Sequence, residues 1–438
     1  MDAKFYKSVK DELIYNILPY WEKYACDDRK KGFYGSIDND NRPDYECERS
    51  IVMTSRFLWT YSAAARLFKK SEYLKMADFA YDVIVNKFLD KKFGGVYWSV
   101  MPDGTPKVAK KQIYGQAFCC YGLSEYAAAI KELREEGKAF PSPQPASQSS
   151  ATPSNEEDLV TLPSERAMNL ALDLYYLMEE FAYESKFGGY VEARAKNWKK
   201  TRDMILSPKD MNCPKSMNTN LHVMEAYTNL YRNLPVVFGD SKSVRLEVGK
   251  SLSDLVRTTV EKILQPGYHL GMFFNLKWKL LSDEISFGHD IEASWLLWEA
   301  ATELNDSELQ AEIKDTVIKM AEVTYEQGFD KENGCLENFL CDGGKIRDRT
   351  RVWWNQAESM NGFYNAWELT QDQKYEKILQ AQWDWILKHQ RDLKGGDWWS
   401  ALDQNGQPVL KEAKGGNWKT SYHNGRTCME ILKRSKTF

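Results

Sequence analysis

The sequence predicts an all-α fold, an (α/α)6 barrel (toroid) with short β-hairpins at one end, formed by residues 1–438 as a single domain. Three observations support this prediction. Short Gly/aromatic stretches recur along the chain, pairs of amphipathic helical patterns lie between them, and both ends are as rich in aromatic residues as the middle. An open solenoid would need polar capping repeats at its ends, so the third observation favours a closed ring.

The Gly/aromatic stretches predict short strands or hairpins. Glycine-rich starts, alternating aromatic residues and N-G or D-G turns are typical of such elements. The stretches recur roughly every 60 residues where the chain is compact, and at longer intervals in the middle. They begin at Gly32, Phe93, Phe187, Met272, Asn333 and Gly395.

The segments between these stretches carry helical periodicity. In residues 55–68 and 72–89, for example, apolar residues recur at i, i+3, i+4 and i+7, as in amphipathic helices. Six hairpin signals, each flanked by two helices, give about twelve helices. We therefore expect six inner and six outer helices, with the hairpins gathered at one end of the ring.

One segment interrupts the repeat. Residues 137–165 are rich in Pro, Ser, Gln and Ala, and such a composition buries too little apolar surface to order itself. We predict a flexible insertion that joins two helices of the barrel. A domain boundary is the alternative, but the repeat resumes in phase after the segment, which favours an insertion.

Bulk composition excludes several classes of function. The net charge of −4 carries no basic footprint for nucleic acid, and no run of 18 apolar residues predicts a membrane span. The first residues lack the apolar region of a signal peptide. Eight cysteines without disulfide-like spacing are typical of a reducing compartment. We therefore expect a cytoplasmic protein, and its acidic character suits a monomer.

Aromatic residues make up 13% of the chain and include 15 tryptophans. Tryptophan can stack on the apolar faces of ring-shaped ligands, or it can fill a large aromatic core. Both interpretations remain open for any single tryptophan. The ligand-binding interpretation is favoured where tryptophan lies beside polar residues typical of a site.

Three histidines are candidates for a catalytic site. His222 and His289 are each followed, three residues later, by a glutamate, and His423 lies in a turn just before a helix. Residues at i and i+3 share one face of a helix, so each His–Glu pair would point the same way. A lone histidine in a helix is more often a satisfied core residue, but three with polar and aromatic neighbours favour function. His269 and His389 are expected to be structural or solvated.

Two further segments belong with the histidines. Trp353, Trp354 and Glu358 fall on nearby faces of a helix start, and Arg56 lies three residues before Trp59. Arginine is a permanent cation with planar donors, which suits a developing oxyanion. The alternative for Arg56 is a surface salt bridge, which its apolar neighbours make less favourable.

These residues give the sequence a family resemblance. It resembles the N-acylglucosamine 2-epimerase superfamily and, within it, the cellobiose 2-epimerases, whose fold is an (α/α)6 barrel. Residues 137–165 are longer and richer in Pro and Ser than is usual there. The segments that carry the resemblance, in the expected order, are SRFLWTYS (55–62), MNTNLHVMEAYT (217–228), GHDIEASWLL (288–297), TRVWWNQAE (350–358) and WKTSYHNGRTCME (418–430).

The resemblance implies an isomerase that epimerises C2 of the reducing-end sugar of a β-1,4-linked disaccharide. Cellobiose would become glucosyl-mannose, and lactose and mannobiose would be further substrates. The reaction would pass through ring opening and a cis-enediolate, and no metal or other cofactor is expected. Histidine suits the proton transfers because its reference pKa of about 6.5 lies near working pH.

By the same resemblance, His289 and His423 form the opposing acid/base pair, and His423 also assists ring opening. Glu292 would hydrogen-bond His289 and fix its tautomer. His222 and Arg56 would bind O1 or O2 and stabilise the enediolate. The expected substrate-binding residues are Tyr114 and Asn218 for hydroxyls, Glu358 for binding or ring opening, Trp353 and Trp354 for stacking, and Trp418 for the non-reducing sugar.

Four alternatives remain at this stage. The first is another activity of the superfamily, either epimerisation of N-acetylglucosamine or epimerisation or isomerisation of mannose. The second is a glycoside hydrolase, with Glu292 and Glu358 as the two carboxylates. The third is a non-catalytic helical scaffold with a concave binding face. The fourth is a metal site, although no H-E-x-x-H helix or zinc-spaced cysteine pair is present.

Overall fold

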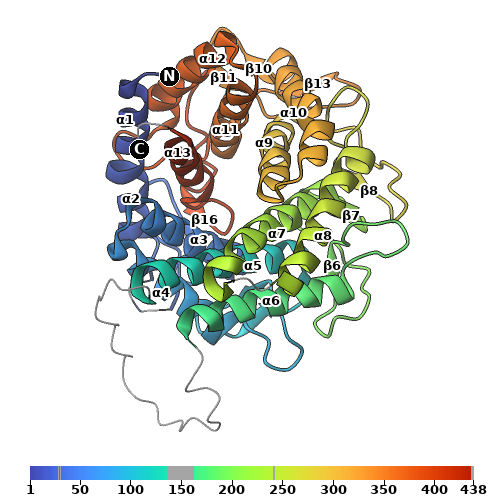
Figure 1. The fold of residues 1–438 in the computed structure, drawn as a ribbon. Helices are drawn as coiled ribbons and strands as arrows, with labels where there is room; N and C mark the ends of the chain where they lie inside the picture. The colour runs from blue at the N-terminus through green and yellow to red at the C-terminus, as the bar shows by residue number, and fades with distance from the viewer. Residues whose placement is uncertain (28, 30, 136–161, 240–241, 436–438) are drawn as a thin grey trace.

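Six long helices surround a central axis and pack side by side as an inner ring in the computed structural model (Figure 1). The structure describes residues 1–27, 29, 31–135, 162–239 and 242–435. Each inner helix contacts the next one along the chain, and the last contacts the first, so the ring closes. The inner helices are α3 (Ile51–Phe68), α5 (Ile113–Ile130), α7 (Met217–Phe238), α9 (Phe287–Glu303), α11 (Trp353–Thr370) and α13 (Tyr422–Arg434).

A second layer of helices surrounds this ring, as the sequence predicts for an (α/α)6 barrel. The first outer position is filled by α1 (Ala3–Glu12), a π-helical turn (Leu13–Ile17) and α2 (Leu18–Tyr24) in succession. In the described chain, no helix has both the length and the apolar character that a membrane crossing requires. The other outer helices are α4 (Leu74–Val83), α6 (Pro163–Phe181), α8 (Lys242–Thr258), α10 (Ser307–Gly328) and α12 (Gln373–Trp385).

The two layers differ in how much of each helix is buried. Every residue of α5 is buried, whereas α8 buries only one stripe, which includes Val248, Leu252 and Leu255. A helix that is apolar all round belongs inside a protein, and an amphipathic helix belongs at its surface. Small residues such as Gly122 allow the close packing of the inner ring, because a Cβ there would lie 2.8 Å from the carbonyl oxygen of Ser55.

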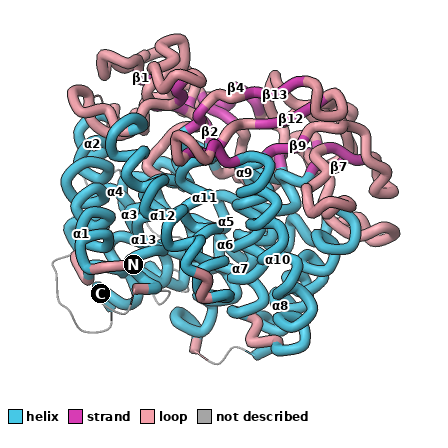
Figure 2. The backbone as a smooth tube through the Cα atoms, turned by 90° about the horizontal axis from the view of Figure 1, so that it is seen from above, coloured by secondary structure: helices cyan, strands magenta, loops and turns pink. Residues whose placement is uncertain are grey.

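Short strands gather at one end of the barrel (Figure 2). All of them are antiparallel and two or three residues long. They are β1 (Ser36–Ile37), β2 (Arg49–Ser50), β3 (Ser99–Val100), β4 (Pro106–Val108), β5 (Lys111–Gln112), β6 (Ala193–Arg194), β7 (Lys215–Ser216), β8 (Phe273–Phe274), β9 (Ile285–Ser286), β10 (Phe329–Asp330), β11 (Cys335–Leu336), β12 (Phe339–Cys341), β13 (Ile346–Asp348), β14 (Arg351–Val352), β15 (Ala401–Leu402) and β16 (Gly415–Gly416).

The predicted local turns are present in every repeat, where an antiparallel bridge closes the chain at the Gly/aromatic stretch, for example between Leu89 and Val96 and between Tyr183 and Tyr190. Local hairpins form between β3 and β4, β10 and β11, and β12 and β13. The six-fold pattern, however, joins the strand before each inner helix to the strand that follows the next outer helix. Ser50, for example, pairs with Ser99, and Gln112 pairs with Ala193. These pairs are β2–β3, β5–β6, β7–β8, β9–β12, β14–β15 and β16–β1.

A repeated side-chain amide fixes the inner helices to the Gly/aromatic stretches. Gln116, the fourth residue of α5, accepts from the backbone N–H of Val96 at 2.8 Å and donates to its carbonyl oxygen at 2.9 Å. Asn220 in α7 and Gln356 in α11 make the same two bonds in their own repeats. Buried backbone groups must be paired, so these amides set where these three inner helices begin.

The predicted insertion at residues 137–165 lies outside the described residues as far as 161. Its last residues, Pro163 to Glu165, form the first turn of α6, because proline is favoured at the first position of a helix. The helical layer therefore resumes a few residues earlier than the composition indicates.

Candidate active site

A cavity of about 920 Å³ opens at the strand end of the barrel. Its floor is formed by the first two turns of the inner helices, and its walls are formed by the loops around the strands. This volume lies in the range of small-molecule sites. Ten of the eleven predicted site residues line it: Arg56, Tyr114, Asn218, His222, His289, Glu292, Trp353, Trp354, Trp418 and His423.

Glu358, the eleventh predicted residue, does not line the cavity. Its fully buried carboxylate lies behind His423, where Oε1 is 2.6 Å from Nδ1 of that histidine, and Oε2 accepts a 3.1 Å bond from Nε1 of Trp295. The expected substrate contact is therefore not supported. Glu358 instead orients His423, and burial and then Glu292 raise the pKa of this carboxyl group well above its usual range. In its ionised form the carboxylate requires a proton on Nδ1 and leaves Nε2 as the free acceptor.

His222 is held in the same way by its own helix. Nδ1 of His222 is 2.7 Å from Oε2 of Glu225, the residue three positions later in α7. The imidazole packs between the rings of Tyr114 and Phe118, whose centroids lie 5.0 and 4.9 Å away. Glu225 is buried as completely as the histidine, so the pair is shielded from bulk solvent.

His289 has a different partner from the one predicted. Its Nδ1 lies 2.7 Å from Oγ of Ser286, the last residue of β9, and its ring lies 4.7 Å from that of Trp354. Glu292, expected to orient His289, accepts a hydrogen bond from Arg426 instead. That prediction is wrong, because the carboxyl oxygen of Glu292 accepts from the guanidinium of Arg426, which is a stronger donor than a neutral imidazole.

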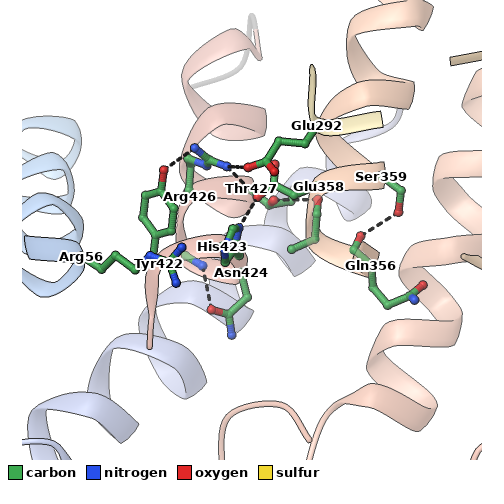
Figure 3. A network of polar contacts seen from close by, with 12 residues as sticks. Arg56, Glu292, Gln356, Glu358, Ser359, Tyr422, His423, Asn424, Arg426 and Thr427 are labelled. Atoms are coloured by element: carbon green, nitrogen blue, oxygen red, sulfur yellow. Dashed lines mark hydrogen bonds and ion pairs between the residues drawn. The ribbon is translucent and has the colours of Figure 1, made fainter. Parts of the chain in front are cut away.

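Arg426 on α13 lies at the centre of the network in Figure 3, and sequence reasoning missed it. Nη2 donates to Oε1 of Glu292 and to Oε1 of Glu358, both at 2.7 Å. Nη1 donates to Glu225 and to the hydroxyl of Tyr422. A signal was present in the sequence, because Arg426 follows His423 by three residues and so shares its helix face.

Arg56 on α3 provides the second cation of the site. Nη1 donates to the carbonyl oxygen of Trp418 at 2.7 Å, and Nη2 donates to the hydroxyl of Tyr114 at 3.0 Å. The guanidinium lies 4.5 Å from the ring centroid of Phe118 and 5.0 Å from that of Tyr422. Arg56 is therefore held at a fixed place in the cavity wall, not paired at the surface.

Three residues of the cavity lining carry a buried polar atom that has no hydrogen-bond partner in the described chain. Within the described chain, Nε of Arg56, Oδ1 of Asn218 and Nε1 of Trp353 are buried without a hydrogen-bond partner. A buried donor or acceptor that stays unpaired costs about 1–3 kcal/mol, so each favours a polar ligand group. Two donors and one acceptor beside tryptophan rings suit a ligand that carries hydroxyl groups on a ring.

The tryptophans occupy two parts of the cavity. The ring of Trp354 lies 4.7 Å from that of His289 and 5.8 Å from that of His423, so it connects the two candidate bases. Trp418 lies nearer the opening, where 38% of its surface is exposed, and its ring is 5.9 Å from those of Trp98 and Tyr114.

Burial shifts the proton affinities of the site. Burial lowers the pKa of His289 to about 3, with a smaller contribution from His222. Burial and then Arg56 lower the pKa values of His222 and His423 well below the usual range, so all three imidazoles are neutral near pH 7. Burial raises the pKa of Glu292 to about 8, although Arg56 opposes this. A neutral imidazole is the form that can remove a proton.

Glu292, Glu358 and His423 have ligand atoms within 4.8 Å of one another, which is a spacing that a metal ion could use. The guanidinium of Arg426 already fills the position of the cation, because its Nη2 donates to both carboxylates. A divalent ion would have to displace a buried arginine. The donor set therefore does not fit a metal as the chain is arranged.

The remaining histidines lie outside the cavity lining, as expected. His269 is bonded through Nδ1 to Asp290 at 2.7 Å, and this carboxylate also accepts from the backbone N–H of Leu270 at 2.7 Å. Asp290 is the fourth residue of α9 and takes the place of the repeated amide. His389 stacks on Trp385 at the end of an outer helix.

Comparison with known proteins identifies the relatives of this barrel. The cellobiose 2-epimerase of Bacteroides fragilis is 36% identical over 433 residues, which cover 99% of this chain and 100% of that protein. The cellobiose 2-epimerase of Dictyoglomus turgidum is 33% identical over 438 residues, which cover 99% and 100%.

A solved structure agrees with these matches. The cellobiose 2-epimerase from Bacillus thermoamylovorans B4167 has a TM-score of 0.84 at 32% identity, with 99% of this chain and 100% of that chain covered. The sequence profile of N-acylglucosamine 2-epimerase (GlcNAc 2-epimerase) matches residues 32–141 and 159–426. The chain therefore belongs to the N-acylglucosamine 2-epimerase family, and it is a carbohydrate epimerase, a class of isomerase.

Proposed function

We propose that the protein epimerises C2 of the reducing-end sugar of β-1,4-linked disaccharides. Cellobiose would become glucosyl-mannose, and lactose and mannobiose would be further substrates. The observation that carries the proposal is the meeting of His222, His289, His423 and Arg56 in one tryptophan-lined cavity. The likeness to cellobiose 2-epimerases over nearly the full length supports the choice of substrate.

The reaction requires four steps. The sugar ring opens and exposes C1 as an aldehyde. A base removes the proton on C2, which is acidic because it lies next to the carbonyl group, and a cis-enediolate forms. An acid then returns a proton to the opposite face of C2, and the ring closes. The site must therefore supply proton carriers on two faces and positive potential near O1 and O2.

His289 and His423 are proposed as the two proton carriers. They come from different helices of the ring, α9 and α13, and the ring of Trp354 lies near both. Because Glu358 keeps the Nδ1 proton of His423, Nε2 of His423 is the proposed base, and it also assists ring opening. His289, beside the hydroxyl group of Ser286, is neutral at rest with a pKa of about 3, so it takes up from solvent the proton that it passes to the opposite face of C2.

Arg56 is proposed to stabilise the enediolate, and His222 is proposed to accept a hydrogen bond at Nε2 from the hydroxyl group of O1 or O2. The hydrogen bonds of the two Nη atoms of Arg56 fix its guanidinium, whose Nε has no partner in the described chain. The ring of Phe118 contacts both this guanidinium and the imidazole of His222. The inner helices also begin at the cavity, so the positive ends of their dipoles favour an anion there. These contributions are larger in a buried site than in water.

The other lining residues are proposed to bind the sugar rings. Tyr114 and Asn218 hold hydroxyl groups, and Trp353 and Trp354 contact the reducing-end ring. Trp418, half-exposed at the opening, stacks on the non-reducing sugar. Glu292, with a pKa of about 8, is protonated at neutral pH and donates a hydrogen bond to a sugar oxygen.

The hydrolase alternative loses support from the position of Glu358. Glycoside hydrolysis needs two carboxyl groups that both reach the scissile bond. Glu292 lines the cavity, but Glu358 lies behind His423 and shares Nη2 of Arg426 with Glu292. We further propose that the protein acts as a monomer in the cytoplasm, since all eight of its cysteines are free thiols.

The test is incubation with cellobiose, followed by sugar analysis for glucosyl-mannose. N-acetylglucosamine, mannose and lactose serve as a substrate panel, and an arm with EDTA tests for a metal. In heavy water, deuterium should enter C2 of the product during turnover. Absence of the label would exclude an enediolate, and release of glucose would indicate hydrolysis. A preference for N-acetylglucosamine or mannose would mean that this sugar, not a disaccharide, is the substrate.

A further inference from the structure

Arg426 connects residues that hold two different histidines. Through Nη1 it contacts Glu225, whose other carboxylate oxygen bonds Nδ1 of His222. Through Nη2 it contacts Glu358, whose same oxygen bonds Nδ1 of His423. One buried guanidinium on α13 is thus one hydrogen bond away from the orienting carboxylates of both imidazoles, as Figure 3 shows for the His423 side.

We propose that Arg426 is a positioning residue that fixes the tautomers of His222 and His423 together. By holding Glu225 and Glu358 as ionised acceptors, it keeps the proton of each imidazole on Nδ1 and leaves both Nε2 atoms able to accept a proton. The consequence for catalysis rests on the proposed function. The consequence for the tautomers does not depend on it.

The need for this cation follows from burial. Three carboxyl groups, those of Glu225, Glu292 and Glu358, are at least 97% buried around the guanidinium. Carboxylates at such close range cannot all stay ionised in a dry interior without a cation. Burial raises the pKa of both Glu292 and Glu358, so this pair carries a proton. Glu358 accepts from two fixed donors, Nη2 of Arg426 and Nε1 of Trp295, whereas Glu292 accepts from Arg426 alone. The proton that burial imposes on this pair therefore lies on Glu292.

Loss of the guanidinium would reverse the tautomers. Without Arg426, burial and mutual repulsion would protonate Glu225 and Glu358 as well. A protonated carboxyl group donates its O–H, so Nδ1 becomes the acceptor and the imidazole proton moves to Nε2. An imidazole with the proton on Nε2 cannot take one there from C2. Lysine at this position cannot supply all the contacts that Arg426 makes with the carboxyl groups, because an ammonium group lacks the planar fork of donors.

The first experiment reads the tautomers directly, by nitrogen NMR of histidine in Arg426→Met and Arg426→Lys. The chain has five histidines, so the spectrum is simple, and variants His222→Gln and His423→Gln assign it. The wild type should show both imidazoles protonated on Nδ1, and Arg426→Met should move both protons to Nε2. If Arg426→Met does not fold, Arg426→Lys still tests the proposal. Lysine keeps the charge but lacks the planar fork of donors, so the proton of at least one of the two imidazoles should move to Nε2. Unchanged tautomers in the folded variants would overturn the proposal.

Arg434 provides a matched control. It lies on α13 two turns beyond Arg426 and bonds Glu368 at 3.2 Å, and within the described residues it bonds neither Glu225 nor Glu358. Arg434→Met therefore removes a guanidinium from the same helix without touching Glu225 or Glu358. It should lower stability and leave the tautomers of His222 and His423 unchanged. A tautomer change in Arg434→Met would show that any damage to α13 produces the effect, and would overturn the proposal.

The second experiment measures kinetics with cellobiose. Arg426→Met should lower kcat by about 10²-fold, because both catalytic imidazoles lose their productive form, while KM changes less than about threefold. Arg434→Met should keep kcat within about twofold. A shifted tautomer with full kcat would overturn the catalytic half of the proposal. If the wild type does not epimerise sugars, the proposed function fails, and the NMR experiment still decides the role of Arg426.

Discussion

Two His–Glu pairs have the same spacing in this chain and opposite structures. In α7, Glu225 bonds His222, the residue three positions before it. In α9, Glu292 turns away from His289 and bonds Arg426, and Ser286 takes its place beside the imidazole. Because residues at this spacing share a helix face, a hydrogen bond between them is feasible, but competing partners from other elements decide whether it forms.

The difference gives the histidines distinct proton chemistry. His222 and His423 are backed by carboxylates, and His289 is backed by a hydroxyl group. A carboxylate stabilises an imidazolium and fixes one tautomer, whereas a hydroxyl can donate or accept and adds no charge. The two proposed proton carriers therefore differ in their partners, with a carboxyl group behind His423 and a hydroxyl group behind His289.

The largest expected effect comes from removing either proton carrier. His289→Ala and His423→Ala should each lower kcat by roughly 10²–10⁴-fold, because a positioned acid or base contributes that much. Deuterium exchange at C2 of cellobiose separates the two roles. His423→Ala should lose exchange starting from the glucose epimer, and near wild-type epimerisation in either variant would contradict the two-base scheme.

A smaller effect is expected when the carboxylate behind His423 becomes an amide. Glu358→Gln removes the acceptor that fixes the Nδ1 proton, so kcat should fall by between about 10- and 100-fold, the usual range for a group that orients a histidine. The protein has to be shown folded, because Glu358 also accepts bonds from Trp295 and Arg426.

Glu292→Gln is the matched comparison for this prediction. Both variants exchange one buried carboxyl group beside Arg426 for an amide. Glu292 bonds no histidine in the described chain, so its replacement should leave the His289 tautomer unchanged in a nitrogen NMR spectrum and act mainly on KM. Equal loss of kcat with a changed His289 tautomer would restore Glu292 as the partner of that histidine.

The ring of helices could be predicted because its signals are local. Periodicity of 3.6 residues marks helices such as α3 and α5, and the recurring Gly/aromatic stretches mark the repeat. The strand pairs between repeats could not be predicted, because the partners lie far apart in the sequence: Ser50 pairs with Ser99, Gln112 with Ala193, and Ser36 with Gly416. Only the spatial closure of a helical layer brings Ser50 beside Ser99.

The members of the candidate site were easier to predict than their bonds. Residues such as His222 and His289 lie in the first two turns of inner helices, and all such turns meet at the cavity. Their partners depend on contacts across the ring. Arg426 reaches Glu225 from 201 residues away, and no spacing rule indicates such a contact.

Replacement of the hydroxyl group behind His289 should have a modest effect. Ser286→Ala removes one neutral hydrogen bond to Nδ1, worth about 1 kcal/mol, so kcat should fall by about five- to tenfold. Ser286→Thr keeps the hydroxyl group and serves as the control for volume. A loss as large as that of Glu358→Gln would mean that the hydroxyl orients its histidine as strongly as a carboxylate does.

The smallest effect concerns pH. Burial lowers the pKa of all three cavity histidines, that of His289 to about 3, so these groups stay neutral below the ordinary value near 6.5. A base works in its unprotonated form. Because the pKa of the histidines is lowered, the pH at which protonation abolishes activity is lowered as well. The acid limb of kcat/KM should therefore lie below pH 6.5. A profile from pH 4 to 9 with cellobiose checks this, and an acid limb at or above 6.5 would mean that Glu358 outweighs burial at His423.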